Sequence, residues 1–323
     1  MASTATKELA FRQATLDDAA FAADVMSAVS PETPWDPVSL RYWWSQPDEF
    51  QEVVRFIVLR AKTPVGFAQI DHARWDVQPE RYASIRGDLI LTDRQRDSLS
   101  ALLAAMEERA TADGARILRV SANEGDTLRI GVIEGRGYRE DRRQKRWELD
   151  LTANRGKILA MTAESRLRMD KAGVEIMTLA ADTDPNVIEK VWHLSEEAGD
   201  DVPTTVPRIP EAMGAYTRWV NAPETHRDRF WIARLGSEVV GVSVLGYPPV
   251  RGVVTTEWTA TARSVRGRGI ARALKCETVA QAIALGVDKV HTGNDAANDP
   301  ILHLNETMGY HLLRSRINYL RSV

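Results

Sequence analysis

Polar and apolar side chains alternate along positions 253–262, which predicts a β-strand. Strict alternation would place four polar residues on one side of this strand, namely Thr255, Glu257, Thr259 and Thr261. Trp258 and Ala260 would then lie on the opposite side. Further on, apolar residues recur at helical spacing over positions 273–283, which predicts an amphipathic helix. The pattern therefore predicts a strand, a turn and a helix in succession.

The turn between strand and helix reads Arg266-Gly267-Arg268-Gly269-Ile270-Ala271. A glycine-bearing turn that opens a helix presents unpaired backbone N–H groups at the positive end of the helix dipole, which favours an anion such as pyrophosphate. Gly267 and Gly269 let the backbone approach the phosphates, and the two arginines add charge-assisted donors. Neither the G-x-G-x-x-G spacing of dinucleotide folds nor the P-loop spacing occurs here, which disfavours an oxidoreductase with a dinucleotide cofactor.

This turn resembles the R/Q-x-x-G-x-G/A signature of the GNAT superfamily of acyl-CoA-dependent N-acyltransferases, with Arg266, Gly269 and Ala271 in its fixed positions. An ordinary strand–helix turn is the alternative that six residues leave open. The segments that follow are also similar to the family in order and spacing. They are a short strand at 287–291, an asparagine-rich stretch, and a closing run at 305–310 with Met308 in the family's leucine place. The resemblance covers positions 173–323.

The resemblance implies an α+β fold whose mixed sheet splays between its fourth and fifth strands and holds CoA there. It also implies direct transfer of an acetyl group from acetyl-CoA to a primary amine of a small molecule or peptide. Glu257 would be the general base, although it precedes Arg266 by nine residues, whereas many members use the position eleven before. A strand glutamate that faces water or forms a salt bridge is the alternative for Glu257.

The resemblance also assigns residues to CoA. Backbone groups of the strand would hold the acyl-pantetheine arm, and the turn would hold the pyrophosphate. These residues are Thr259, Ala260, Thr261, Arg266, Gly267, Arg268, Gly269, Ile270 and Ala271. Asn294 and Asn298 would contact the pantetheine arm or the nucleotide, or else serve as turn and N-cap residues. Asn305 stands where many members carry a general-acid tyrosine. It can hydrogen-bond CoA but cannot supply a proton, so no general acid is assigned.

The chain repeats itself at a constant offset. Gly114 corresponds to Gly286, and Gly137 corresponds to Gly309, both 172 positions further on (286 − 114 and 309 − 137). We therefore predict two tandem copies of one domain, at 1–151 and 173–323, with a polar connecting helix at 152–172. Each copy would run strand, two helices, three antiparallel strands, helix, strand, helix, strand.

The first copy lacks the phosphate turn, because it reads Arg94-Gln95-Arg96-Asp97-Ser98-Leu99-Ser100-Ala101 at that place. If Arg94 is the motif arginine, Asp97 and Leu99 fill the small positions; if Arg96 is, Leu99 and Ala101 fill them. Both alignments put a bulky or anionic side chain where phosphate would bind. We therefore expect the first copy to be a scaffold that binds no CoA.

Composition narrows the function further. The formal net charge of −3 argues against nucleic acid as the main partner, and no apolar run is long enough to span a membrane. The single cysteine, Cys276, excludes an intramolecular disulfide and is typical of a cytoplasmic protein. The six histidines form no metal-binding motif, so we expect no metal. A homodimer is an open possibility.

The sequence says least about the acceptor substrate. The acidic run Glu196, Glu197, Asp200 and Asp201, followed by Tyr216 and Trp219, would suit a cationic amine, or would simply be a solvated helix end. The sequence also leaves a second function class open. In that alternative, the chain is a non-catalytic acyl-CoA-binding module that serves regulation or assembly.

Overall fold

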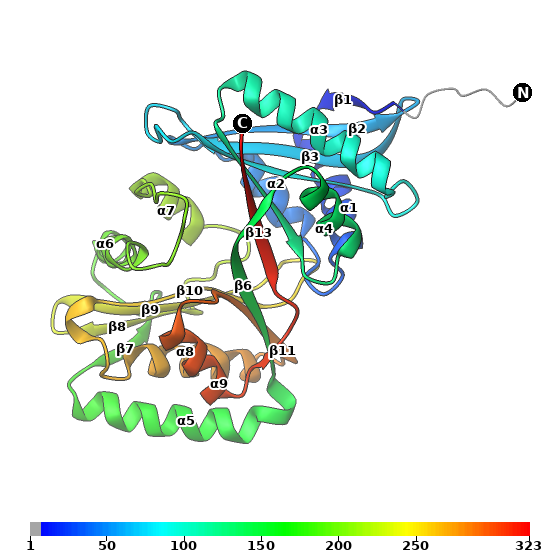
Figure 1. Ribbon diagram of the computed structural model, residues 1–323. Helices are drawn as coiled ribbons and strands as arrows, with labels where there is room; N and C mark the ends of the chain where they lie inside the picture. The colour runs from blue at the N-terminus through cyan, green and yellow to red at the C-terminus, as the bar shows by residue number, and fades with distance from the viewer. Residues whose placement is uncertain (1–7) are drawn as a thin grey trace, which may run out of the picture.

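The computed structural model describes residues 8–323, in which one 13-stranded mixed sheet runs through the whole molecule. The strand order along its main path is β1-β2-β3-β4-β5-β13-β6-β11-β10-β9-β8-β7, and β12 pairs with β6. Figure 1 shows the N-terminal half above the C-terminal half, with β6 and β13 crossing between them. The strands are β1 (Ala10–Gln13), β2 (Gln51–Arg60), β3 (Thr63–Ala73), β4 (Tyr82–Leu89), β5 (Ile117–Asn123), β6 (Arg139–Asp150), β7 (Glu175–Thr178), β8 (Phe230–Leu235), β9 (Glu238–Gly246), β10 (Thr255–Thr261), β11 (Lys289–Asp295), β12 (His311–Leu312) and β13 (Arg316–Ser322).

Nine α-helices flank this sheet within the described residues. They are α1 (Ala19–Val29), α2 (Pro37–Ser45), α3 (Arg96–Asp113), α4 (Thr127–Gly135), α5 (Leu151–Lys171), α6 (Val187–Gly199), α7 (Met213–Val220), α8 (Ile270–Ala284) and α9 (Asp299–Met308). Both halves follow the order predicted from the sequence, with α5 between them along the chain. The predicted α+β fold with two tandem copies is therefore confirmed.

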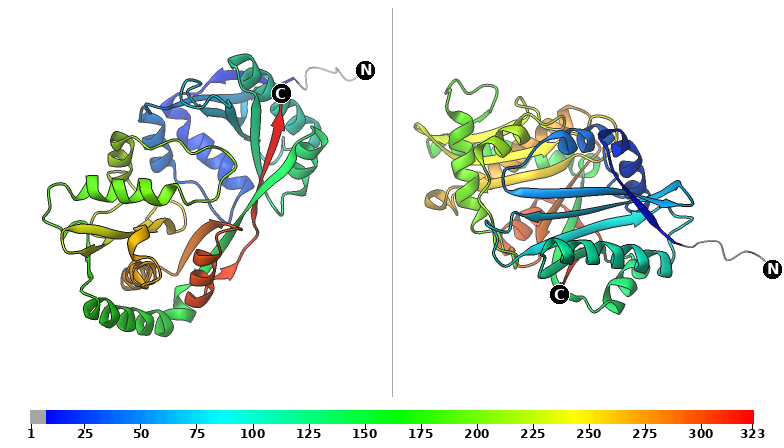
Figure 2. Two further views of the ribbon diagram at one scale, coloured as in Figure 1. Left: turned by 60° about the vertical axis from the view of Figure 1, so that its left-hand side comes forward. Right: turned by 90° about the horizontal axis from the view of Figure 1, so that it is seen from above.

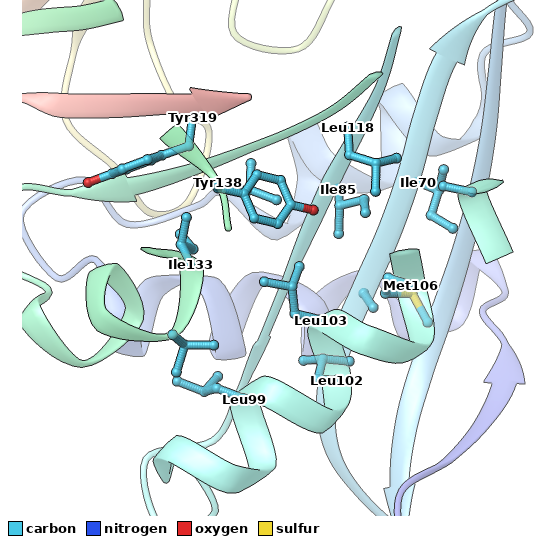
Figure 3. Close-up of a cluster of buried hydrophobic side chains, with 14 of the residues drawn as sticks. Ile70, Ile85, Leu99, Leu102, Leu103, Met106, Leu118, Ile133, Tyr138 and Tyr319 are labelled. Atoms are coloured by element: carbon cyan, nitrogen blue, oxygen red, sulfur yellow. The ribbon is translucent and has the colours of Figure 1, made fainter. Parts of the chain in front are cut away.

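In the N-terminal half, each face of the sheet is covered by a pair of helices. On one face, Met26 of α1 and Leu40 of α2 pack with Ile57 and Phe67. On the other face, α3 supplies an apolar stripe that points toward the strands, as Figure 3 shows for Leu102 and Met106. Burial of these aliphatic side chains is the main source of stability for the half.

The C-terminal half is built in the same way. Helices α6 and α7 cover one face, where Leu194 and Tyr216 pack with Phe230 and Val244. Helix α8 covers the other face, and α5 packs along the outer side of α8, as the left view of Figure 2 shows. Asp150 begins α5 by accepting a hydrogen bond from the Ala153 N–H at 2.8 Å, a favourable N-cap.

The two halves exchange their last strands. Residues 144–150 of β6 pair with β11 of the C-terminal half, whereas β13 pairs with β5 of the N-terminal half. These two segments, 144–150 and 316–322, are related by the 172-residue offset of the repeat (316 − 144). Tyr319 of β13 is consequently part of the N-terminal core, as Figure 3 shows. The predicted division into 1–151 and 173–323 stays a prediction, and the sheet contacts cross it.

The parallel strands in the middle of each half separate soon after they meet. Strands β4 and β5 pair only from Tyr82 to Ser84, and β10 and β11 pair only at Thr255 and His291. Beyond these pairs, the strands diverge and leave a V-shaped opening between them. The splay predicted between the fourth and fifth strands is therefore present in both halves, and the C-terminal splay lies next to the predicted phosphate turn.

Candidate active site

The phosphate turn has the backbone conformation that the sequence predicts. Gly267 and Gly269 adopt φ values of +75° and +89°, in the left-handed region that disfavours other residues. Gly269 is the N-cap of α8, and Ile270 is buried, so Ile270 can offer only its backbone to a ligand. Within residues 8–323, the backbone N–H groups of positions 267–269 donate to no other group. The turn is therefore ready to receive an anion.

Basic side chains surround this turn. Arg268 is exposed and forms no ion pair with any described residue. Arg266 is held by Asp201, with an Nη2–Oδ2 distance of 2.6 Å. A third cation comes from α5, because a Cβ on Gly269 would lie 3.2 Å from the Arg168 guanidinium. The sequence did not indicate Arg168, which is a hundred positions away along the chain.

The equivalent place in the N-terminal half is closed. Helix α3 begins at Arg96 directly after an extended Gln95, and positions 94–97 include no left-handed residue. Arg94 turns inward, where it pairs with Asp88 of β4 and Asp126, the N-cap of α4. A pyrophosphate would therefore meet no left-handed glycine turn here, and Arg94 is already engaged by two carboxylates.

Arg129 fills the splay of the N-terminal half. Its guanidinium donates to the Gly87 carbonyl of β4 at 2.5 Å and to the Ser121 carbonyl of β5 at 2.9 Å. These carbonyls belong to the two diverging strands, so the side chain takes the place that a pantetheine arm would need. The cavity of about 20 Å³ between Arg129 and α3 holds no more than a water molecule. Arg129, Gly87 and Ser121 also line a much larger cavity between the halves.

Glu257 lies at a β-bulge in β10. Thr256 pairs with Leu245 and Trp258 pairs with Val244, so Glu257 is the extra residue between them. The bulge breaks the alternation, and the predicted sharing of one side by Glu257, Thr259 and Thr261 is wrong. Glu257 lies on the side of Gly246, where a Cβ would come within 2.7 Å of its Oε1. Thr259 lies on the opposite side, where its hydroxyl bonds that of Ser243 at 2.9 Å.

Gly246 and Glu257 both line a large cavity of about 650 Å³ between the halves. The Glu257 side chain is exposed to this cavity, although protein atoms surround its position on most sides. Burial, with a further contribution from the Glu224 carboxylate, raises the pKa of Glu257 to about 7. A carboxylate with this pKa is half ionised near neutral pH, as a general base requires.

Glu224 and His291 also line this cavity, and neither was predicted from the sequence. Glu224 accepts a hydrogen bond from the Trp43 indole at 2.7 Å, while its Oε2 has no partner among the described residues. His291 of β11 contacts Glu148 through Nε2 at 2.7 Å, its Nδ1 is unpartnered within the same residues, and burial lowers its pKa. Neither residue belongs to a recognisable motif, so only the fold brings them beside Glu257.

The cavity is formed by both halves together. The Asp36 carboxylate at the start of α2 accepts hydrogen bonds from the backbone N–H groups of Val250 and Arg251, both at 2.7 Å. Tyr42 donates its hydroxyl proton to the Arg218 carbonyl at 2.8 Å. These bonds, together with that between Trp43 and Glu224, hold α2 of the N-terminal half over the mouth of the C-terminal splay.

The acidic run at the end of α6 does not face this cavity. Glu196 pairs with Arg208, and Asp200 pairs with the same guanidinium at 2.9 Å. Hydrogen bonds from Arg263 and Arg266 lower the pKa of Asp201 to about 2. Of the two alternatives for this run, the pairing with arginines disfavours attraction of a cationic amine, because the charge is already neutralised.

The three asparagines lie on β11 and on or beside α9. Asn305 is fully buried, accepts a hydrogen bond from the Lys275 ammonium at 2.9 Å and donates one to the Asn294 carbonyl oxygen at 2.7 Å. Its side chain therefore faces the interior, and the predicted contact with CoA is absent from this geometry. Burial lowers the pKa of Lys275 to about 8. Asn298 takes the N-cap position of α9, and its contact with CoA stays a prediction.

No helix within residues 8–323 has the length and apolar character needed to cross a membrane. No group of three or more histidine, cysteine, aspartate or glutamate residues in this part of the chain is arranged to hold a metal ion.

Comparisons with known proteins agree with this architecture. Residues 192–310 match the acetyltransferase (GNAT) family. A tandem GNAT protein from the clavulanic acid biosynthesis pathway, solved without AcCoA, is 16% identical with a TM-score of 0.75, and the match covers 98% of both chains. A GCN5-related N-acetyltransferase from Sphaerobacter thermophilus is 18% identical with a TM-score of 0.65, over 99% of this chain and 97% of that one. No curated protein sequence matches the chain. At these identities the structural likeness establishes the fold.

Proposed function

Residues 192–310 match the GNAT acetyltransferase family, and on that premise we propose that the chain transfers an acetyl group from acetyl-CoA to a primary amine. The observation that carries the proposal is Glu257, a carboxylate with a pKa of about 7 in the cavity at the mouth of the β10–β11 splay. A binding module has no need of a base with this pKa, whereas an amine acyltransferase does.

In the proposed reaction, the amine nitrogen attacks the thioester carbonyl carbon. The amine proton passes to the Glu257 carboxylate, directly or through a water molecule in the cavity. A new C–N bond forms, the C–S bond breaks, and CoA leaves as the thiolate, which then takes up a proton. The chain itself forms no covalent bond to the acetyl group.

CoA is proposed to bind across the C-terminal splay. Beyond Thr255, the edge of β10 that faces β11 has no strand partner, so backbone groups of Thr259, Ala260 and Thr261 are available to the pantetheine arm. The turn from Arg266 to Ala271 would hold the pyrophosphate with its free N–H groups. The conformation of this turn fits such a ligand, because both left-handed positions are glycine.

We predict that each chain binds one CoA. The C-terminal half has the glycine turn and an open splay, whereas Arg94 and Arg129 close the corresponding places in the N-terminal half. Calorimetric titration of the full chain with CoA should give a stoichiometry near one. Two equivalent sites per chain would contradict the scaffold role of the N-terminal half.

We predict that kcat/KM rises with pH through an apparent pKa near 7, because Glu257 accepts a proton only in its ionised form. Below that pH, the rate should fall about tenfold per pH unit. Glu224→Gln removes a negative charge that raises the pKa of Glu257, so it should move this limb to lower pH. If kcat/KM does not rise with pH near 7, Glu257 is not the group that titrates. The same follows if Glu224→Gln leaves the apparent pKa of this rise unchanged.

The non-catalytic alternative is tested by one measurement. An acetyltransferase should release the free thiol of CoA when acetyl-CoA and an amine are supplied together, at a rate that depends on the amine. A chain that binds CoA tightly but releases no thiol with any amine would be an acyl-CoA-binding module.

A further inference from the structure

The wall of the cavity opposite Glu257 is rich in arginine. Arg55, Arg86, Arg146 and Arg316 line it, from strands β2, β4, β6 and β13 respectively. Sheet register brings them into a band, since Arg55 and Arg86 both lie opposite Gln69 of β3, and Arg316 lies opposite Gln144 of β6. Because the halves exchange their last strands, Arg316 of β13 lies in the sheet of the N-terminal half, next to β5.

None of these four arginines forms an ion pair with any residue from 8 to 323. Arg55 donates to the Gln69 side chain at 3.3 Å, Arg146 to the Asn123 side chain at 3.4 Å, and Arg316 to the Ser121 hydroxyl at 2.6 Å. The Arg86 guanidinium lies 4.8 Å from the centre of the Trp35 ring. Their principal partners are therefore neutral.

Some other arginines with limited exposure are paired with carboxylates, whereas Arg119 bonds the Ser84 hydroxyl and no carboxylate among residues 8–323. Arg136 pairs with Glu107 at 2.5 Å, and Arg234 pairs with Asp182 and Asp184. The four cavity arginines differ from Arg136 and Arg234 because they line a large cavity and have no carboxylate partner among residues 8–323. An unpaired guanidinium withdrawn from water is costly unless a negative group neutralises it.

The carboxylates near the band are already engaged. Asp88 and Asp126 pair with Arg94, and Asp36 accepts four backbone N–H groups. Asp71, two positions from Gln69, accepts a hydrogen bond from that residue at 3.0 Å, and Glu32 acts on Arg146 only through its charge. Glu257 and Glu224 line the C-terminal side of the same cavity. The cavity therefore has a cationic wall on one side and two carboxylates on the other.

Burial lowers the pKa of all four arginines, most clearly for Arg316, whose pKa falls to about 9. The positive charges of neighbouring arginines lower the pKa of Arg316 further, and Arg86 has the largest effect among them. The four remain cationic at neutral pH, so their mutual repulsion would be relieved by a bound oxyanion.

We infer that the acceptor is a small molecule that carries an oxyanion, a carboxylate or a phosphate, in addition to its amine. The inference rests on the proposed function and specifies its substrate. The oxyanion binds the arginine wall, and the amine then points across the cavity to Glu257. A cavity of about 650 Å³ is of the size that small-molecule ligands occupy, which favours such an acceptor over a protein side chain.

The test compares amines that differ only in the anionic group. 4-Aminobutanoate is paired with 4-aminobutanamide, and 3-aminopropyl phosphate with 3-aminopropanol. With acetyl-CoA as donor, thiol release should favour the anionic member of at least one pair by about 10- to 100-fold in kcat/KM, the effect of a charge-assisted hydrogen bond. The pair with the larger ratio identifies carboxylate or phosphate as the preferred group.

Arg86→Gln and Arg55→Gln should each reduce this ratio toward one, mainly through a higher KM for the anionic amine. Arg155→Gln, which changes an exposed arginine on α5 outside the cavity, is the matched control and should keep the ratio. Circular dichroism and CoA titration of every variant check that the fold and the CoA site are intact.

A binding measurement separates this inference from the proposed function. Without acetyl-CoA, the anionic amines should raise the melting temperature of the wild type, and Arg86→Gln should lose that increase. Thiol release with no preference between paired amines, together with no thermal stabilisation, would overturn the inference and leave the acetyltransferase proposal standing. Stabilisation without thiol release for any amine would support the anion site and contradict the proposed reaction.

Discussion

Replacing Glu257 with glutamine is expected to lower turnover by about 10²- to 10⁴-fold, the usual contribution of a positioned general base. Glutamine keeps the size and polarity of the side chain but cannot accept the amine proton. CoA affinity should change little, because the side chain faces the cavity whereas the phosphate turn lies beyond the far end of β10. Thiol release, with CoA titration in parallel, measures both quantities.

The matched control is Glu238→Gln, which removes an exposed carboxylate from the start of β9 and should leave turnover unchanged. The deficit of Glu257→Gln should also shrink at high pH, where more of the amine is already neutral. Unchanged turnover would move the base to another residue of the cavity, with Glu224 and His291 as the candidates. Loss of CoA binding without a specific rate effect would give Glu257 a structural role.

Replacing Gly269 with leucine is expected to weaken CoA binding by about tenfold or more. A left-handed conformation costs other residues about 1–2 kcal/mol, so the turn would relax away from the shape that receives the pyrophosphate. The φ of Gly269 is +89°, and its Cβ would lie 3.2 Å from the Arg168 guanidinium. The leucine side chain would also occupy the approach of the pyrophosphate to the free N–H groups. Calorimetric titration with CoA measures the effect.

Gly286→Leu provides a control with the same backbone strain. Gly286 has a φ of +77°, nothing lies within 4 Å of its Cβ position, and it follows the far end of α8 from the phosphate turn. This variant should lose stability but keep its affinity for CoA. Equal CoA affinity of Gly269→Leu and the wild type would show that the turn is not the phosphate site.

The features that the sequence predicted well depend on neighbours along the chain. The turn at 266–271 has its conformation because glycines stand at the two left-handed positions, which is a local property. The missing turn in the first copy was predictable for the same reason, since Asp97 and Leu99 are present where glycine or alanine is needed. The repeat was visible because two pairs of glycines keep one offset.

The features that it missed depend on partners elsewhere in the fold. The bulge at Glu257 exists only relative to β9, so an alternation rule applied to β10 alone put the side chain on the wrong side. The acidic run at 196–201 looked available because the arginines that neutralise it, such as Arg208, do not share its helix. Pairing between distant segments is set by tertiary structure, which a linear pattern does not record.

One signal of the arginine wall was present in the sequence. Arg55 interrupts an apolar strand, between Val53-Val54 and Phe56-Ile57, and a charge within such a run requires a partner or a ligand. Arg86 lies between Ile85 and Gly87 in β4 and lacks this signal. What the sequence could not show is that both side chains enter the same cavity as Arg316, which β13 brings from the other half of the molecule.

The exchange of last strands also determines when the protein can finish folding during its synthesis. Arg316 of β13 bonds Ser121 of β5, which the ribosome makes 195 positions earlier. Until β13 emerges, that edge of β5 is exposed, and an exposed strand edge can pair with another chain. The N-terminal half therefore cannot complete its sheet before β13 has been synthesised.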